Sequence, residues 1–351
     1  MRLGFDADAI TERGTSTALF DYAAGAQSIL GHEVVVFFNP QTSLPNAVER
    51  FQQQFRMVPF DNSDELRRAT ANAKLDFYYR LTGGKRREIF GEADRRGVHA
   101  VFRHCEPHGD VYAYVSEWLA DWMSGGTAPF VPHIVDLPKP VTNWRDKLGI
   151  PDKAFVVGRY GGFDQFNLPF AKRAVIQALE RRKDIFFLFV NTDRFCEHER
   201  VIHLPAVYSN EDKSAFIATC DVGLNAKKIG ESFGLANAEF MALGKPVFSW
   251  AGGKDQNHVV MTPKSEWLYH GRLDLLALFT DYCTNASDQQ LSRRSVAQFL
   301  PEAVMRQFEE VFLSGRFDSS QVRAGQLLKT RRYMQGHGLR ARYKIKAALN
   351  R

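Results

Sequence analysis

The chain has 351 residues, of which 44% are hydrophobic and 25% charged, a balance typical of a globular protein with two domains and ample cores. Its longest dense apolar run, residues 185–190, has the length of a strand, so no transmembrane helix is expected. The first residues, M-R-L-G-F-D-A-D, carry charge where a signal peptide needs an apolar run. Scattered cysteines without a CxxC pair favour a reducing compartment, so we expect a cytoplasmic protein.

The net charge of +6 is unevenly distributed along the chain. Residues 321–351 contain nine Lys or Arg residues and no acid, so the rest of the chain carries a net charge of −3. Nucleic-acid binding by the body of the protein is therefore not indicated. Within this tail, L-R-A-R-Y-K-I-K-A alternates at period two, which does not give one apolar helical face. We expect a loose basic segment that meets either solvent or an anionic membrane surface, and in the second case the protein would be peripheral at the inner membrane face.

The first half of the chain alternates between short apolar strands and helical stretches. Expected strands are residues 2–5, 32–38, 57–60, 75–79, 98–104 and 111–115, and expected helices are residues 18–30, 46–55, 64–74 and 116–122. This βαβα rhythm predicts a parallel sheet covered on both faces, with ligands at the carboxyl ends of the strands. The loop after the first strand, residues 9–17, contains Gly14.

One loop of the first half concentrates titratable residues. H-C-E-P-H-G-D, residues 104–110, contains two histidines, a cysteine and two acids, which raises the hypothesis of a metal site. Zinc-ligand spacings such as CxxC or HExxH are absent from it. The better interpretation is a loop at the carboxyl end of a strand that faces a ligand.

The second half begins after a segment of linker composition, L-P-K-P-V-T-N, at residues 137–143. Expected strands are residues 154–160, 185–191, 201–204, 221–225 and 246–251, and expected helices are residues 168–182, 210–220, 273–283, 288–299 and 301–313. Tyr208 follows a strand end, where it could pack on a nucleobase, although a tyrosine in such a place is more often part of the core.

The most informative stretch is G-E-S-F-G-L-A-N-A-E-F-M-A-L-G-K-P-V, residues 230–247. It predicts a buried helix over residues 233–243, with Ser232 as its N-cap, Gly244 just past its end and Pro246 preventing continuation. Glu239 is the exception on this apolar helix, and a second carboxylate, Glu231, precedes it. Free amides and the dipole at a helix start form an anion site. The pattern therefore indicates a ligand with a phosphate at the first turn and hydroxyl groups for the two glutamates.

This stretch resembles the E-x7-E motif of retaining glycosyltransferases with the GT-B fold, most closely family 4, whose usual form is E-S-F-G-L-x-x-x-E-x-M-A-x-G-x-P-V. In that family the first glutamate contacts the donor sugar and the second holds the nucleotide ribose, roles that fall here on Glu231 and Glu239. The remaining motif positions at the helix start, expected to bind the donor, are Ser232, Phe233, Gly234 and Leu235.

Weaker resemblances extend the match to the first half. Y-V-S-E-W-L and F-V-P-H-I-V-D, at residues 114–119 and 130–136, resemble the family's V-S-E-x-L and V-P-N-G-V-D. The resemblance implies that Gly14 lets backbone approach the donor or acceptor, although a plain turn glycine is equally compatible. It also implies a histidine near the donor sugar, for which His104 and His108 are both candidates.

The family's phosphate loop is where this chain departs from the pattern. A G-R pair followed by a lysine five residues later normally binds the diphosphate. With Gly158 and Arg159 aligned to G-R, Asp164 replaces the lysine; with Gly161 aligned to the glycine, Gly162 and Asn167 replace both bases. The bases that could supply the missing charge are Arg159, Lys227 and Lys228, of which the two lysines could equally be solvated loop residues.

Together these observations predict an α/β protein of two Rossmann-like domains facing a cleft, the GT-B architecture. Residues 1–140 would form the acceptor-side domain, residues 141–320 the nucleotide-sugar-binding domain, and residues 321–351 the basic tail. The expected activity is transfer of a sugar from a nucleotide-sugar to a hydroxyl of a glycan or lipid-linked acceptor, with retention and without a metal or other cofactor.

Two other classes stay open from the sequence. One is a sugar-nucleotide hydrolase or epimerase on the same fold. The other is a non-catalytic nucleotide- or glycan-binding protein, which the departure at the phosphate loop raises and the presence of both glutamates disfavours. A Rossmann dehydrogenase is disfavoured because no strand is followed by G-x-G-x-x-G.

Overall fold

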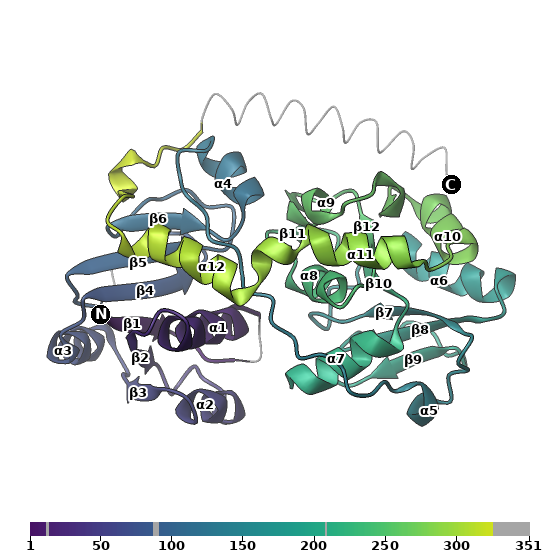
Figure 1. The fold of residues 1–351 in the computed structure, drawn as a ribbon, viewed down its shortest axis with the longest axis horizontal. Helices are drawn as coiled ribbons and strands as arrows, with labels where there is room; N and C mark the ends of the chain where they lie inside the picture. The colour runs from purple at the N-terminus through teal and green to yellow at the C-terminus, as the bar shows by residue number, and fades with distance from the viewer. Residues whose placement is uncertain (12–13, 87–90, 208, 326–351) are drawn as a thin grey trace. The chain divides into compact units, whose positions relative to one another are not determined.

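The fold was obtained as a computed structural model, which describes residues 1–11, 14–86, 91–207 and 209–325 (Figure 1). The chain forms two compact units. The first contains Met1–Ile134 and the described residues from Phe299 onward, and the second contains Val135–Gln298. Most of the basic tail and Tyr208 lie outside the described residues.

The first unit is built on a parallel sheet in the strand order β3-β2-β1-β4-β5-β6. Its strands are β1 (Arg2–Ala7), β2 (Glu33–Phe38), β3 (Arg56–Pro59), β4 (Phe77–Thr82), β5 (Arg95–Ala100) and β6 (Val111–Tyr114). The near-continuous apolar run of β2, E-V-V-V-F-F, is buried from its second residue on, as expected for a strand covered on both faces. The prediction of a parallel sheet in this half is confirmed.

Helices cover this sheet and complete its core. They are α1 (Gly14–Ser28), α2 (Pro45–Gln52), α3 (Ser63–Ala73), α4 (Glu117–Ser124) and α12 (Pro301–Phe308), which continues into the π-helical turn η3 (Glu309–Leu313). Figure 1 shows α12 beside the strands of the first unit, and it contacts α1.

The position of α12 corrects the domain boundaries expected from the sequence, which assigned residues 299–320 to the second domain. Val304, Met305 and Phe308 are fully buried in the core of the first unit, where the ring of Phe308 stacks on Phe5 of β1. Burying these three side chains decides the placement. The free energy gained by burying their apolar area exceeds the entropy cost of closing the long stretch of chain between the two parts of the first unit.

The second unit contains a parallel sheet in the order β14-β12-β10-β7-β8-β9. Its strands are β7 (Phe155–Arg159), β8 (Ile185–Val190), β9 (Val201–Leu204), β10 (Val222–Asn225), β12 (Val247–Trp250) and β14 (Leu268–Tyr269). Counted along the chain, both sheets have the order 3-2-1-4-5-6 of the doubly wound Rossmann fold. Ligands of such sheets bind at the carboxyl ends of the strands where the order reverses. In the second unit this position lies between β7 and β10.

Helices again fill the connections between the strands. They are α5 (Arg145–Leu148), α6 (Pro169–Arg181), α7 (Asn210–Thr219), α8 (Leu235–Ala242), α9 (Asn257–Met261), α10 (Arg272–Asp281) and α11 (Ala286–Ser295). The expected helices and strands of this half are present, with ends shifted by a few residues. The two-residue strands and α9 were not expected, because such short elements leave no periodic signal in the sequence.

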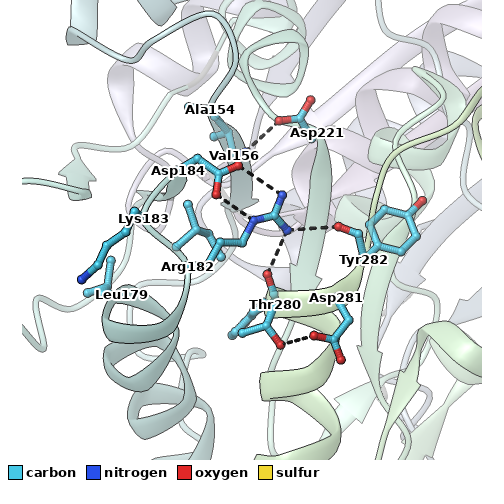
Figure 2. A network of polar contacts seen from close by, with 12 residues as sticks. Ala154, Val156, Leu179, Arg182, Lys183, Asp184, Asp221, Thr280, Asp281 and Tyr282 are labelled. Carbon is cyan, nitrogen blue, oxygen red and sulfur yellow. Dashed lines mark hydrogen bonds and ion pairs between the residues drawn. The ribbon is translucent and has the colours of Figure 1, made fainter.

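A network of charged groups fixes the amino ends of the strands in the second unit (Figure 2). Arg182, just after α6, pairs with Asp184 and donates to the carbonyl oxygen of Tyr282. Asp221, just before β10, accepts from the backbone amide of Val156 at 2.7 Å. These ties lie at the edge of the sheet opposite to the carboxyl ends, so they hold the strands together without occupying the ligand edge.

Within the described part of the chain, no helix is long and apolar enough to cross a membrane.

Two buried histidines make the first unit sensitive to acid. Burial lowers the pKa of His99 to about 4 and that of His133 to about 3. In the unfolded chain a histidine takes up its proton near pH 6.5, so between that pH and the lower pKa the unfolded state binds more protons. The free energy of unfolding therefore decreases as the pH falls through this window. Each histidine contributes a decrease of up to about 1.4 kcal/mol per pH unit.

We predict that His133→Asn reduces this loss, because asparagine does not titrate. Urea unfolding of the variant between pH 6.5 and 4 should show a shallower decline in the free energy of unfolding than that of the natural protein. Parallel declines would mean that His133 is already solvated, and so able to protonate, in the folded state.

Candidate functional site

The loop between β10 and α8 carries the first carboxylate of the motif. It contains a two-residue strand, β11 (Gly230–Glu231), which pairs in parallel with β13 (Asp255–Gln256). Gly230 has φ +82°, and a Cβ there would lie 1.8 Å from the carbonyl oxygen of Asp255. Only glycine allows this approach, so the loop that presents Glu231 depends on a residue without a side chain.

Glu231 is paired with a lysine of its own loop. Its Oε2 lies 2.8 Å from Nζ of Lys227, and both side chains are about four-fifths buried, with exposed fractions of 22% and 21%. The charge of Glu231 also favours the protonated form of Arg159 at the end of β7. The carboxylate thus lies among cations at the carboxyl ends of β7 and β10.

Glu239, the second carboxylate, lies on α8 and is almost completely buried, with 5% of the residue exposed. Its Oε1 is 3.6 Å from Nζ of Lys213, which lies near the start of α7 and whose side chain is 12% exposed. A carboxylate in such a place is stable only with a charge or hydrogen-bond partner. Lys213 was missed from the sequence because a lysine on a helix 26 positions away carries no local signal.

The start of α8 differs from the prediction in one respect. The N-cap is Gly234, with φ +97°, which has no side chain to cap the helix. The expectation that Ser232 is the N-cap is therefore wrong, because the left-handed turn at Gly234 starts the helix two residues later. The first-turn amides of the helix, from Leu235 onward, have no carbonyl of the helix to pair with and form its electropositive end.

The end of α8 follows the prediction. The amide of Gly244 donates to the carbonyl of Met241, and the amide of Lys245 donates to that of Phe240. This pair of bonds is the Schellman motif, in which Gly244 occupies the position just past the cap. The motif ends α8 and satisfies carbonyl groups of its last turn.

Arg159 points into the structure and holds the loop after β7. Its guanidinium donates to Oγ1 of Thr192, to the carbonyl oxygen of Asn191 and to that of Gly162. The amide side chain of Asn191 donates to the carbonyl of Gly161 at 2.8 Å. Burial lowers the pKa of Arg159 to about 10, so the group is still charged at neutral pH. Only 5% of the surface of Arg159 is exposed, so its position makes it a support for the glycine loop.

Lys228 is the exposed cation of this region. Its backbone amide donates to Oδ1 of Asn167, which ties the loop after β10 to the loop after β7. Asn167 occupies the position where one alignment of the phosphate loop expects a lysine. It supplies no charge there, and its side chain binds the backbone of Lys228 instead.

Helix α9 supplies two groups that sequence reasoning missed. The amide of Glu231 donates to Nδ1 of His258 at 3.2 Å, and Nε2 of His258 is 2.8 Å from the carbonyl oxygen of Trp250. The side-chain amide of Asn257 donates to the carbonyl of Phe233 at 2.7 Å. The ring of Phe233 is itself buried, so this motif residue contributes core packing.

The candidate residues of the first unit lie after β1 and β5. Gly14 is the first residue of α1 and not a loop residue, which corrects the prediction, and a Cβ there would meet no atom within 4 Å. His108 is buried, and its Nδ1 lies 2.7 Å from the carbonyl oxygen of Glu106. Burial lowers its pKa, so the ring is neutral at pH 7. His104 is partly exposed and anchors its loop through its carbonyl oxygen, which accepts from Tyr114.

Among the described residues, no three His, Cys, Asp or Glu side chains are placed to hold a metal ion. This includes the loop of residues 104–110, where Tyr112 and Tyr114 both donate to the carbonyl oxygen of His104. The loop is thus held by tyrosine hydroxyls of β6.

No known family model matches the sequence, and no curated protein matches it. The fold, in contrast, resembles solved structures over nearly its whole length. HepE (Alr3699) of Anabaena, solved with UDP and glucose, has a TM-score of 0.68 and 13% identity, covering 88% of this chain and 98% of its own. A glycosyltransferase from Rickettsia africae has a TM-score of 0.62 and 10% identity, covering 90% of this chain and 98% of its own.

A third similar structure is WaaG, a glycosyltransferase involved in lipopolysaccharide biosynthesis, with a TM-score of 0.62 and 11% identity over 89% of this chain and all of its own. The chain has the GT-B fold. At these identities the likeness concerns the fold, so the residues of the site have to be interpreted from this chain itself.

In this GT-B chain the position of Arg159 leads to a stability prediction. Arg159→Met should lower the free energy of unfolding by at least about 2 kcal/mol, because hydrogen bonds to a charged group are worth about 1.5–3 kcal/mol each. Lys228→Met, at an exposed site, should stay within about 0.5 kcal/mol. Urea denaturation of both variants provides the test. Equal, small losses would show that the guanidinium is directed at solvent or ligand.

Proposed function

We propose that this protein is a retaining glycosyltransferase that transfers a sugar, a hexose or a pentose, from a nucleotide-sugar to a hydroxyl acceptor. One observation carries the proposal: two carboxylates, Glu231 just before α8 and Glu239 in its second turn, flank the first-turn amides of this helix, and each has a lysine within 4 Å. Carboxylates next to an anion-binding helix end suit a ligand that combines hydroxyl groups with phosphates. A nucleotide-sugar has both, and HepE of the same fold was solved with UDP-glucose.

The roles follow from burial. Glu239 is the more buried of the two and is assigned the ribose hydroxyls, with Lys213 keeping its charge compensated. Glu231, less buried and nearer the loop, is assigned the hydroxyls of the donor sugar. The diphosphate takes the first-turn amides of α8 together with Lys227 and Lys228.

Catalysis on this arrangement is mainly electrostatic. Breaking the bond between the sugar and the diphosphate leaves negative charge on the leaving phosphate, and fixed cations and amides stabilise that charge as it develops. The protein groups available for this in the second unit are the start of α8 and the lysines of the loop before it. Either His104 or His108 is assigned a contact with the donor sugar, and the transfer is assigned retention of configuration.

The acceptor and the compartment extend the proposal. Residues of the first unit, at the carboxyl ends of β1, β4 and β5, are assigned to a glycan or lipid-linked acceptor. Four free cysteines suit a cytoplasmic protein, and the basic tail is assigned an anionic membrane surface.

The two glutamates should respond differently to loss of charge. Glu239→Gln should weaken binding of UDP about tenfold or more, since a charge-assisted hydrogen bond to the ribose is lost. Glu231→Gln should instead strengthen UDP binding, because Lys227 is released from its ion pair and the site becomes more positive. Isothermal titration calorimetry with UDP measures both constants.

The melting temperatures of the two variants serve as the control for folding. Equal and negligible changes in affinity would sink the assignment of the donor site, as would a loss of affinity in Glu231→Gln that matches that of Glu239→Gln.

Transfer should also survive a chelator, because the proposed chemistry uses side chains and helix amides alone. We predict unchanged consumption of the nucleotide-sugar in excess EDTA. Activity that is abolished by EDTA and restored by a divalent ion would replace the proposed electrostatics with a metal-assisted mechanism.

A further inference from the structure

The segment that presents Glu231 is held from one side by the start of α9. His258 contacts the backbone of Glu231, and Asn257 contacts the backbone of Phe233. The pairing of β11 with β13 lies directly before these contacts, with Glu231 opposite Gln256. Three consecutive residues, 256–258, thus bind the loop of residues 230–233.

The bonds of His258 define its chemical form. The carbonyl oxygen of Trp250 can only accept, so Nε2 of His258 carries the hydrogen and donates to it. Nδ1 therefore has a lone pair, which accepts the amide hydrogen of Glu231. The ring links the end of β12 to β11, and each of its nitrogens satisfies one backbone group. Full burial, which lowers the pKa of His258 to about 4, keeps the ring in this neutral form at pH 7.

Packing alone does not account for this pair of side chains. An apolar residue would fill the space at position 258, but it would leave the amide of Glu231 and the carbonyl of Trp250 without these bonds. The bonds fall on the backbone of the residue whose carboxylate is proposed to touch the sugar. Glu239 and the first-turn amides belong instead to α8, where the helix itself fixes the backbone.

We propose that His258 and Asn257 are positioning residues for the donor sugar, which act by fixing the backbone that carries Glu231. This inference rests on the proposed function. A carboxylate whose backbone is already fixed loses little freedom when it binds a hydroxyl, so the effect belongs to binding of the sugar. Binding of the nucleoside diphosphate draws also on Glu239 and the first-turn amides of α8, so it should change less than binding of the sugar.

The experiment compares the dissociation constants of UDP and UDP-glucose by calorimetry. His258→Gln places its amide near the Nε2 position, so it keeps the bond to Trp250 and loses the bond to Glu231. His258→Asn places its oxygen near the Nδ1 position and keeps the bond to Glu231. We expect His258→Gln to shift the ratio of the two constants against UDP-glucose by about fivefold, the value of one hydrogen bond. His258→Asn should keep the natural ratio.

Asp221→Asn is the matched control. It weakens the network at the amino ends of the strands in the same unit, where Asp221 binds the backbone of Val156 (Figure 2) and pairs with Arg145. It should lower the melting temperature and leave the ratio of the dissociation constants unchanged. If His258→Gln does not fold, Asn257→Leu tests the second bond of the support and should shift the ratio in the same direction.

The outcomes separate the inference from the proposed function. Natural protein that binds UDP and UDP-glucose, with a ratio that His258→Gln leaves unchanged, overturns the positioning role alone. Equal weakening of both ligands in His258→Gln and His258→Asn also overturns it, because it indicates a general structural defect. Natural protein that binds neither ligand overturns the donor assignment, and the positioning role with it.

Discussion

A buried carboxylate needs a partner, and this requirement explains much of the second unit. Glu239 lies on an apolar helix with almost no exposure, where an uncompensated charge would cost several kcal/mol. Lys213 of α7 answers this need, and Lys227 does the same for Glu231. The ion pair of Lys213 with Glu239 links α7 to α8, and that of Lys227 with Glu231 lies within the loop between β10 and α8. Both carboxylates of the proposed donor site are thus kept charged by these pairs.

The need of buried charges for partners also explains the position of Arg159. The sequence presents it as a base for phosphate, but the end of β7 is buried, and its guanidinium donates to the carbonyl oxygens of Gly162, in the loop after β7, and of Asn191, just after β8. A glycine loop without side chains needs such support if it is to keep one conformation. Because Arg159 is used for this purpose, the cations left for a ligand are the lysines after β10.

Sequence reasoning succeeded where a pattern is local and failed where it is not. Alternating strands and helices predicted both parallel sheets, and the stretch of residues 230–247 predicted α8 and the glycine just past its end. Lys213 and His258 could not be found in this way, because each reaches its partner across the fold from a helix with no distinguishing motif. The N-cap was misplaced at Ser232 for a physical reason. Cap preferences favour serine, but the left-handed conformation at Gly234 overrides them.

The balance of charge at this site suggests how one ligand can engage it. Lys213 pairs with Glu239 and Lys227 with Glu231, and the charge of Glu231 also acts on the buried guanidinium of Arg159. A diphosphate carries about two negative charges or more, while a helix start offers only about half a positive charge. On the proposed function, Lys227 turns from Glu231 to the phosphate and releases the carboxylate for the sugar. Glu231 stays in place during this exchange because its backbone is held by His258 and by β13 and does not depend on the lysine.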